Sequence, residues 1–510
     1  MRSLRRTRSA IGMVAAVGLL LTGCAGYVDQ GGGSADDLVL GSTVVPASFD
    51  PAQAGDANYV PYFQAAYDTL IRREPDGGLA PMLATDWSYD ESRTVLSMAL
   101  RDDVTFSDGV AFDADVAKQN LERFRDGTGP LGHYLALLEE VVVVDRNHVE
   151  LHLSAPDPSL LVHLGDAAGL MASPAAFDSP DLATVPAGSG PYVMDTSATV
   201  QGSSYVFTRR DDYWNPSLQH YERLSFDIFP DETALLNALK TGQVDAGNLS
   251  NRNNVNEAER AGIEIVRPDI HVSWVGLIIF DRTGTTIPAL GDERVRRAIN
   301  HAFDGPRILE ALYDGQGTPT QQIFSEASDA YDPALNDTYD HDPALARELM
   351  AEAGYQDGFD ITMPTSAFFD QPTLQIIRQS LADIGIRVTY EDAGQDLISR
   401  MLAGDYPMSL MFLGAPVDWT LVNSYLTPDS AWNPFHAQDP ELSALIDAVP
   451  AADDGEQAEL FGEINQYMVD HAWFAPWFWI DETYAVNDGT DVVLQTQQNV
   501  PSVYNYTPSA

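Results

Sequence analysis

The sequence LRDDVTFSDG at residues 100–109, followed by FDADV at 112–116, gives the strongest indication of the fold. In the segment before it, residues 87–100, apolar side chains alternate with polar ones around a charged turn, which predicts a β-hairpin. Residues 112–116 look like the capped start of a helix that continues to Phe124. A hairpin beside a helix indicates a mixed α/β fold.

The rest of the chain also alternates between strand-like and helix-like segments. Further strands are predicted at 38–41, 141–144, 149–153, 274–280, 386–390 and 407–413, and another is predicted to begin at 244–245. Helices are predicted at 60–71, 231–240, 293–303, 343–353 and 372–384. Because strands and helices alternate in the second half, we expect βα units and a largely parallel sheet there.

Length and composition describe an acidic globular protein. The chain has 510 residues, of which 45% are hydrophobic and 20% charged, enough for two or three domains and not typical of a disordered or fibrous chain. Acidic residues outnumber basic ones by 75 to 28, which gives a net charge of −47, and the only lysines are Lys118 and Lys240. Such a surface repels nucleic acid and anionic membranes, so no nucleic-acid partner is expected.

The first 23 residues read as a signal peptide. A basic head precedes an apolar stretch at 10–21, which is too short to span a bilayer. The segment ends in Leu-Thr-Gly-Cys, which resembles the bacterial lipobox and implies that Cys24 carries a lipid. Residues 24–35 then form a flexible tether. Two alternatives stay open: an incidental free thiol, and twin-arginine export in place of the general route.

The sequence shows no catalytic constellation. Cys24 is the only cysteine, and the ten histidines form no metal-binding spacing such as HExxH. The Gly-Ser-Gly at 188–190 lacks the flanking pattern of a nucleophile elbow, and no phosphate-binding loop is present. We therefore expect no enzyme, no cofactor and no metal site.

Tryptophan is concentrated near the end of the chain. The last hundred residues hold five of the eight tryptophans, at positions 419, 432, 473, 477 and 479. Large aromatic faces with polar edges suit a pocket for small polar solutes, whereas the alternative is that these rings fill a core.

Several separated motifs together resemble one family, the extracytoplasmic solute-binding proteins of peptide and nickel ABC importers (family 5), which include dipeptide- and oligopeptide-binding proteins. The motifs run in order along the chain: SFDP (48–51), LAPMLATDW (79–87), LRDDVTFSDG (100–109), GSGPY (188–192), DYW (212–214), GQVD (242–245), RVRRAI (294–299) and LMAEAGY (349–355). Matches extend from residue 38 to about residue 480, nearly the whole mature chain.

The resemblance implies an α/β fold of two lobes joined by a hinge, with an extra α+β domain inserted in the first lobe. Carried onto this chain, lobe I comprises 36–71, 187–274 and 485–510, the inserted domain 72–186, and lobe II 275–484. A solute would be trapped as the lobes close on it, and a permease would recognise the closed state.

The resemblance also implies a set of pocket residues. The family presents an acidic residue to a peptide amino group in a Gly-Trp-x-x-Asp loop, which here reads GAPVD, with Gly414 and Asp418 retained. Ala415 replaces the tryptophan, although Trp419 follows, and Phe412 stands where some members carry an arginine for the ligand carboxylate. By the same alignment, further residues line the cleft, with plain packing as the alternative for each: Asn58, Tyr59, Asn248, Trp274, Tyr425 and Trp479.

The sequence therefore predicts a monomeric, lipid-anchored extracytoplasmic protein that captures a short peptide or another amine-bearing solute for an ABC permease and its ATPase. Opines and metal chelates stay open as solutes. An oligosaccharide is the alternative within the family, since Trp419, Trp432 and Trp479 could stack on sugar rings. An exported hydrolase and a sensory partner of a membrane receptor are alternatives of other classes.

Overall fold

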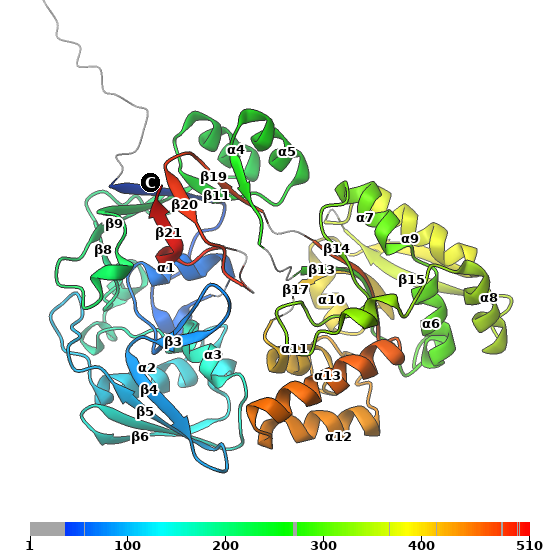
Figure 1. Cartoon of the computed structure of the whole chain (residues 1–510), viewed down its shortest axis with the longest axis horizontal. Helices are drawn as coiled ribbons and strands as arrows, with labels where there is room; N and C mark the ends of the chain where they lie inside the picture. Colours follow the sequence, from blue (N-terminus) through cyan, green and yellow to red (C-terminus); the bar gives the residue numbers. More distant parts are fainter. Residues whose placement is uncertain are drawn as a thin grey trace, which may run out of the picture.

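The computed structural model (Figure 1) describes residues 36–509 apart from Asp56, 269–272, Ala367, Ala415, 481–482, Gln497 and Asn499. The predicted signal peptide, the tether and Cys24 lie outside the described residues. Within the part that is described, no helix has the length and apolar character needed to cross a membrane.

Two lobes lie side by side, and each has its own hydrophobic core (Figure 1). The core of the second lobe is built from residues between Trp274 and Trp479. The core of the first lobe draws on residues between Leu38 and Ala246 and on the last part of the chain, from Tyr484 to Tyr506. The predicted two-lobed α/β fold is confirmed.

A seven-stranded sheet forms the centre of the first lobe. Its strands, in spatial order, are β12 (Glu264–Val266), β19 (Tyr484–Val486), β11 (Ala246–Asn248), β1 (Asp37–Ser42), β10 (Arg223–Ile228), β9 (Ser204–Arg209) and β8 (Tyr192–Met194). The central strand β1 is parallel to β10 and β11, whereas the outer pairs are antiparallel. Helices α4 (Glu232–Thr241) and α5 (Arg252–Ala261) pack together beside β1 and β11.

The inserted region contains a four-stranded antiparallel sheet. Its strands are β4 (Ala84–Tyr89), β5 (Val95–Leu100), β7 (His148–Leu153) and β6 (Leu138–Asp145). Helix α2 (Ala114–Asp126) packs on β6, and its cap residue Asp113 accepts a hydrogen bond from the Val116 amide at 3.1 Å. The predicted hairpin, helix and two strands are therefore confirmed. Apolar residues of this region belong to the same core as those of the seven-stranded sheet.

The first helix of the first lobe is shorter than the sequence predicts. The helix predicted at 60–71 ends at Gln64 as α1 (Val60–Gln64), and Ile71 starts β2 (Ile71–Arg73), which pairs with β3 (Leu79–Pro81). The reason is tertiary: the carbonyls of Ala65 and Ala66 accept hydrogen bonds from the amides of Tyr192 and Gly190, each at 2.9 Å. A helix could not continue while its carbonyls bond to another segment.

The second lobe corrects the prediction of a largely parallel sheet. Its main sheet, in the order β14 (Thr318–Pro319), β18 (Phe474–Ile480), β13 (Ser273–Ile279) and β17 (Met408–Gly414), is antiparallel throughout. Among the described strands of this lobe, only β15 (Phe359–Thr365) and β16 (Ile386–Asp392), joined by α9 (Gln371–Asp383), form a parallel pair. The prediction was wrong because β13 pairs with strands far along the chain, which alternation of elements does not specify.

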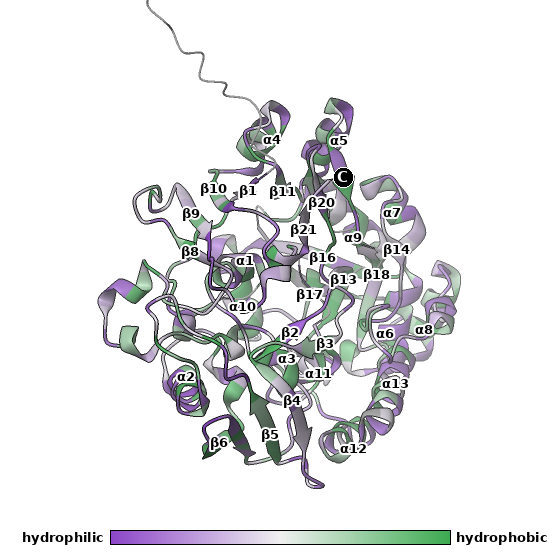
Figure 2. Cartoon of the chain, turned by 60° about the vertical axis from the view of Figure 1, so that its left-hand side comes forward, coloured by the Kyte–Doolittle hydropathy of each residue, from purple (hydrophilic) through white to green (hydrophobic). Residues whose placement is uncertain are grey.

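Helices surround these sheets. In chain order they are α6 (Glu293–His301), α7 (Gly305–Tyr313), α8 (Pro343–Glu352), α10 (Leu397–Leu402), α11 (Asp418–Tyr425), α12 (Pro440–Ala448) and α13 (Asp454–Asp470). The helices predicted in this half, which correspond to α6, α8 and α9, are confirmed. Figure 2 shows hydrophobic residues along β5 and hydrophilic residues on much of α12 and α13. Helix α3 (Leu160–Leu164) and the terminal pair β20 (Thr490–Val492) and β21 (Tyr506–Pro508) complete the first lobe.

Motif residues connect distant segments of the first lobe and tie that lobe to its inserted region. Asp50 caps the turn at Pro51 and receives two hydrogen bonds from the Arg123 guanidinium of α2, at 2.5 and 2.6 Å. The fully buried Asp68 accepts hydrogen bonds from Tyr213 and Trp214, the YW of the motif at 212–214. These contacts give the acidic and aromatic motif positions a structural role.

The Asp50–Arg123 pair allows a stability test. Arg123→Ala should lower the free energy of unfolding by about 1–3 kcal/mol, because it leaves a mostly buried carboxylate without its charge-assisted hydrogen bonds. As a control, Lys240→Ala breaks a more exposed ion pair with Glu257 and should cost less than about 1 kcal/mol. Urea unfolding of both variants measures the difference, and equal effects would contradict the proposed role.

Candidate functional site

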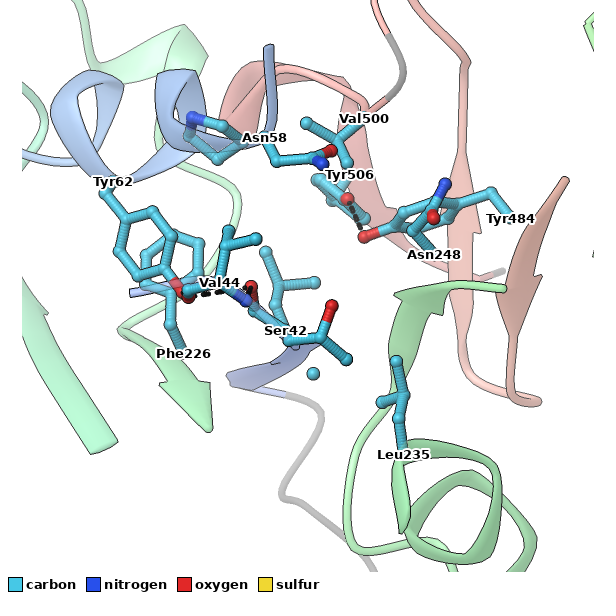
Figure 3. A pocket seen from close by; sticks show the side chains of 14 residues that line it. Ser42, Val44, Asn58, Tyr62, Phe226, Leu235, Asn248, Tyr484, Val500 and Tyr506 are labelled. Carbon is cyan, nitrogen blue, oxygen red and sulfur yellow. Dashed lines mark hydrogen bonds between the residues drawn. The ribbon is translucent and has the colours of Figure 1, made fainter. Parts of the chain in front are cut away.

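The first lobe has a small cavity where its parallel strands end. It measures about 40 Å³ and opens beside the last residues of β1, at the carboxyl ends of β10 and β11 (Figure 3). Open α/β sheets bind ligands at this edge, because the strand ends and the following loops leave a crevice there. Side chains from five parts of the chain meet in it: Ser42, Val44, Asn58, Tyr62, Phe226, Leu235, Asn248, Tyr484, Val500 and Tyr506.

Polar groups in this cavity are only partly paired. The side-chain oxygen of Asn58 is buried without a hydrogen-bond partner, and the Asn248 amide donates to the Thr483 carbonyl at 3.5 Å. The Tyr506 hydroxyl donates to that of Tyr484 at 2.6 Å (Figure 3). The structure thus brings the predicted residues Asn58 and Asn248 to one cavity. Tyr59, the other predicted residue of this loop, is half-buried against the core and does not line it.

The second lobe presents its predicted residues where β17 ends and α11 begins. Gly414 is the exposed last residue of β17, and Asp418 is the first residue of α11, whereas Ala415 lies outside the described residues. Trp419 is half-buried against the core of the lobe. The buried hydroxyl of Tyr425 donates to the Gly414 carbonyl at 3.3 Å, which fixes the start of the loop.

Asp418 stands in an unusual electrostatic position. Burial raises the pKa of its carboxyl to about 6, against the smaller effect of a hydrogen bond from Ser328, and the nearby Asp329 raises this pKa further. Among the residues that the structure describes, no arginine, lysine or histidine forms an ion pair with it. Among the described residues, the Ser328 hydroxyl is the group whose hydrogen bond favours the ionised form of this carboxyl.

The remaining predicted residues lie deeper or apart. Trp274 and Trp479 are neighbours across β13 and β18, and both are almost fully buried, at 1% and 0% exposure. Phe412 is 37% exposed and stacks on Phe369, with ring centroids 6.4 Å apart. Packing therefore accounts for the two tryptophans in this conformation, and their contact with a solute stays a prediction.

The site contains residues that the sequence did not single out. A second cavity, of about 140 Å³, lies between the lobes and is lined by Ala57, Arg73, Tyr134, Val162, His163, Asp166, Pro416, Val417, Thr420 and Gln498. Arg73 pairs with Asp166 at 3.7 Å, and the His163 ring stacks on Tyr134 at 4.0 Å. Pro416 and Val417 lie in the loop before Asp418, and this position is the sequence signal that could have indicated the cavity. The other residues that line it belong to no motif.

The lobes touch on two sides. The Ser159 hydroxyl lies 3.1 Å from that of Thr420, next to the larger cavity. At the opposite edge, Arg252 of α5 forms an ion pair with Asp314 and donates to the Leu312 carbonyl at the end of α7 (Figure 1). The conformation described is thus one in which polar contacts connect the lobes.

Among the described residues, no three His, Cys, Asp or Glu side chains come together as metal ligands. The two cavities and Asp418 are features that could hold a solute.

Sequence comparison assigns the family. Residues 78–435, more than half of the chain, match the bacterial extracellular solute-binding proteins, family 5. The chain belongs to this family. The glutathione-binding protein GsiB of Escherichia coli K12 is 26% identical over 376 residues, which are 71% of this chain and 71% of GsiB. The chain is therefore a solute-binding protein of the kind that serves ABC transporters.

Solved structures share the fold. HbpA2 from Haemophilus parasuis aligns with a TM-score of 0.81 at 21% identity, over 93% of this chain and all of that one. DppA from Helicobacter pylori, solved with the peptide STSA, has a TM-score of 0.75 at 21% identity, over 93% of this chain and 98% of its own. NikA from Brucella suis, solved with Fe(III)-EDTA, has a TM-score of 0.78 at 22% identity, over 93% of this chain and all of that one.

The contact between α5 and α7 can be tested in solution. Arg252→Ala should destabilise the closed arrangement by up to about 1 kcal/mol, since it removes an ion pair and a carbonyl contact between the lobes. Small-angle scattering of the solute-free variant should then give a larger radius of gyration. Arg260→Ala, an exposed change on the same helix, is the control. A profile unchanged from wild type would show that this contact does not hold the lobes together.

Proposed function

We propose that this protein captures a short peptide, or another solute with a free amine, between its lobes and delivers it to an ABC permease and its ATPase without chemical change. The observation that carries this proposal is Asp418, a largely buried carboxyl whose pKa is raised by burial. An ammonium group beside it would stabilise the ionised form, because oppositely charged groups pair strongly away from water.

The position of Asp418 supports this role. It lies in the loop between β17 and α11, two residues before Thr420, which touches the first lobe through Ser159. An amine bound there would lie close to the seam between the lobes. A solute that contacts both lobes binds their closed arrangement more tightly than the open one, so it shifts the population toward closure.

The oligosaccharide alternative receives less support from the geometry. Trp479 is fully buried, and Trp432 packs on Phe280 with ring centroids 6.5 Å apart. The third tryptophan considered for sugar stacking, Trp419, is half-buried at the start of α11, so part of its ring is also covered by the protein.

The proposal also covers the attachment of the protein to the membrane and the limits of its domains. We propose that Cys24 carries the lipid, that 24–35 is the tether, and that the protein works as an extracytoplasmic monomer. The limits proposed for its parts are 36–71, 187–274 and 485–510 for lobe I, 72–186 for the inserted domain and 275–484 for lobe II.

Asp418→Asn tests the amine contact directly. Trialanine should bind the variant about 10- to 100-fold more weakly than wild type, as expected for the loss of one charge-assisted hydrogen bond of about 1.5–3 kcal/mol. Isothermal titration with trialanine and with N-acetyl-trialanine measures this, and acetylation should weaken wild-type binding to a similar degree. Asp429→Asn changes a fully exposed carboxylate and serves as the control. Equal affinity of Asp418→Asn and wild type would remove the basis of the proposal.

The pH dependence provides a separate test. The carboxyl of Asp418, with its pKa near 6, is ionised above that pH and neutral below it. An amine solute is protonated throughout this range, so its affinity should fall as the pH decreases from 7 to 5. Asp418→Asn should show a flatter profile in the same titrations, and a wild-type affinity that rises toward pH 5 would contradict the assignment.

A further inference from the structure

The second lobe holds one phenylalanine almost entirely in solvent. Phe368, in the loop between β15 and α9, is 90% exposed, whereas Val200, the next most exposed large hydrophobic residue among those described, is 60% exposed. The loop has an ordered backbone, since the Phe368 amide donates to the Ser366 hydroxyl at 3.1 Å and the Phe369 amide donates to the Ser366 carbonyl at 3.2 Å. A ring held in water in this way gains free energy when an apolar group covers it.

Two further rings make this surface a patch. Phe369 follows directly in the chain and is buried in the core of the lobe, and Phe412 of β17, 37% exposed, stacks on it with ring centroids 6.4 Å apart. Side chains two residues apart on a strand share a face, and on this face of β17 Met408 and Leu410 are buried. The core of the second lobe therefore reaches the surface at Phe412. We call Phe368, Phe369 and Phe412 the aromatic rim.

One side of the aromatic rim adjoins the cavity between the lobes. In Figure 1, β17 lies on the side of the second lobe that faces the first, between α7 and α11. Gly414 ends β17 two residues after Phe412, and the loop that follows contributes Pro416 and Val417 to that cavity. The chain thus leads from the aromatic rim directly into the wall of the cavity.

The other side of the aromatic rim adjoins the contact between α5 and α7. Burial raises the pKa of the Tyr313 hydroxyl to about 12, and the nearby carboxyl of Asp370 raises it further. Asp370 directly follows Phe369, and Tyr313 directly precedes Asp314, which pairs with Arg252 of the first lobe. The loop that carries Phe368 therefore lies beside a point where the lobes touch.

Asp418 and the aromatic rim are joined by one short loop. Because a chain extends by at most about 3.6 Å per residue, Gly414 and Asp418 lie no more than about 14 Å apart, the length of about four extended residues of a peptide. A short peptide whose amine pairs with Asp418 therefore has side chains within reach of the end of β17, where Phe412 lies.

Charge also favours an apolar partner for these rings. The three side chains of the aromatic rim are uncharged, and Asp370, which caps α9, places a carboxyl directly after Phe369. The whole protein carries a net charge of −47. An anionic side chain of a solute is repelled by such a surface, whereas an apolar side chain gains burial against the rings.

We infer that the aromatic rim is an apolar subsite, which receives one aromatic side chain of a solute whose amine pairs with Asp418. The inference rests on the proposed function and narrows its solute class to amines that carry an apolar group. Aromatic rings pack edge to face or offset on one another, in addition to burying apolar surface, so an aromatic side chain gains more here than a short aliphatic one.

The test measures side-chain preference by isothermal titration. The probes are trialanine and the tripeptides in which one alanine, at each position in turn, is replaced by phenylalanine or by glutamate. Wild type should bind at least one phenylalanine peptide about 10- to 100-fold more tightly than trialanine, as expected for the burial of one aromatic side chain. The glutamate peptide with the same position replaced should bind more weakly than trialanine.

Variants of the aromatic rim assign the preference. Phe368→Ala and Phe412→Ala should each reduce the preference for the phenylalanine peptide by at least about fivefold and change the affinity for trialanine by less than about twofold. Phe412→Arg should bind the glutamate peptide more tightly than the phenylalanine peptide, because it places a cation at the subsite. Leu345→Ala is the matched control: Leu345 is also 37% exposed, but it lies on α8, far from the first lobe (Figure 1), so the preference should persist.

The failures can be told apart. Equal wild-type affinity for trialanine and all phenylalanine peptides, or an undiminished preference in both alanine variants, overturns the subsite, whereas the proposed function stands as long as N-acetylation weakens binding. Absence of binding for every peptide overturns both. If Phe412→Ala does not fold by circular dichroism, Phe368→Ala decides, because its ring is 90% exposed. An unchanged preference in Phe368→Ala together with a lower molar mass in light scattering would assign this ring to a contact between copies of the chain and overturn the subsite.

Discussion

Among the described residues, the two lobes share no hydrophobic core. Each lobe buries its own aromatic and aliphatic side chains, and polar contacts connect the two lobes: Ser159 with Thr420, and Arg252 with the end of α7. Exposed and half-exposed polar contacts contribute little each. A modest binding energy from a solute is therefore enough to change how often the lobes are closed, which is the property that a binding protein needs.

A solute can act on the seam between the lobes only if each lobe is itself rigid. Asp245 accepts a hydrogen bond from the Val39 amide at 2.7 Å and ties the start of β11 to the central strand. A Cβ atom on Gly190 would lie 2.4 Å from the Ala66 carbonyl carbon, so only glycine allows the close approach that ends α1 and joins two distant segments of the first lobe. Because these contacts fix each lobe internally, the seam between the lobes is the part that can respond to a solute.

The acidic charge also shapes the site. A buried carboxyl such as Asp418 is costly to ionise in a protein that is already strongly negative, and burial is the main cause of its raised pKa. A cationic group of a solute removes this cost, whereas an anionic group needs a local cation.

Local signals in the sequence determined much of the secondary structure. Three elements depend on residues that are close in the chain: the hairpin around residue 90, the helix capped by Asp113, and the helix ended by Gly242, which adopts φ +69°. Their sequence patterns can therefore be recognised without knowledge of the tertiary structure. The order of motifs likewise identified the family and its two lobes, and two residues that the resemblance implied, Asn58 and Asn248, line one cavity of the first lobe.

Only the tertiary structure decided which strands pair, where α1 ends and which aromatic rings are buried. Strand β13 takes partners from the segments near 410 and 477, and Trp274 and Trp479 become neighbours inside the core through that pairing. Arg73, Asp166, Thr420 and Gln498 line one cavity although they come from distant parts of the chain. No local sequence pattern encodes this proximity. It results from the packing of distant helices and strands, and the burial of apolar surface over the whole chain determines that packing.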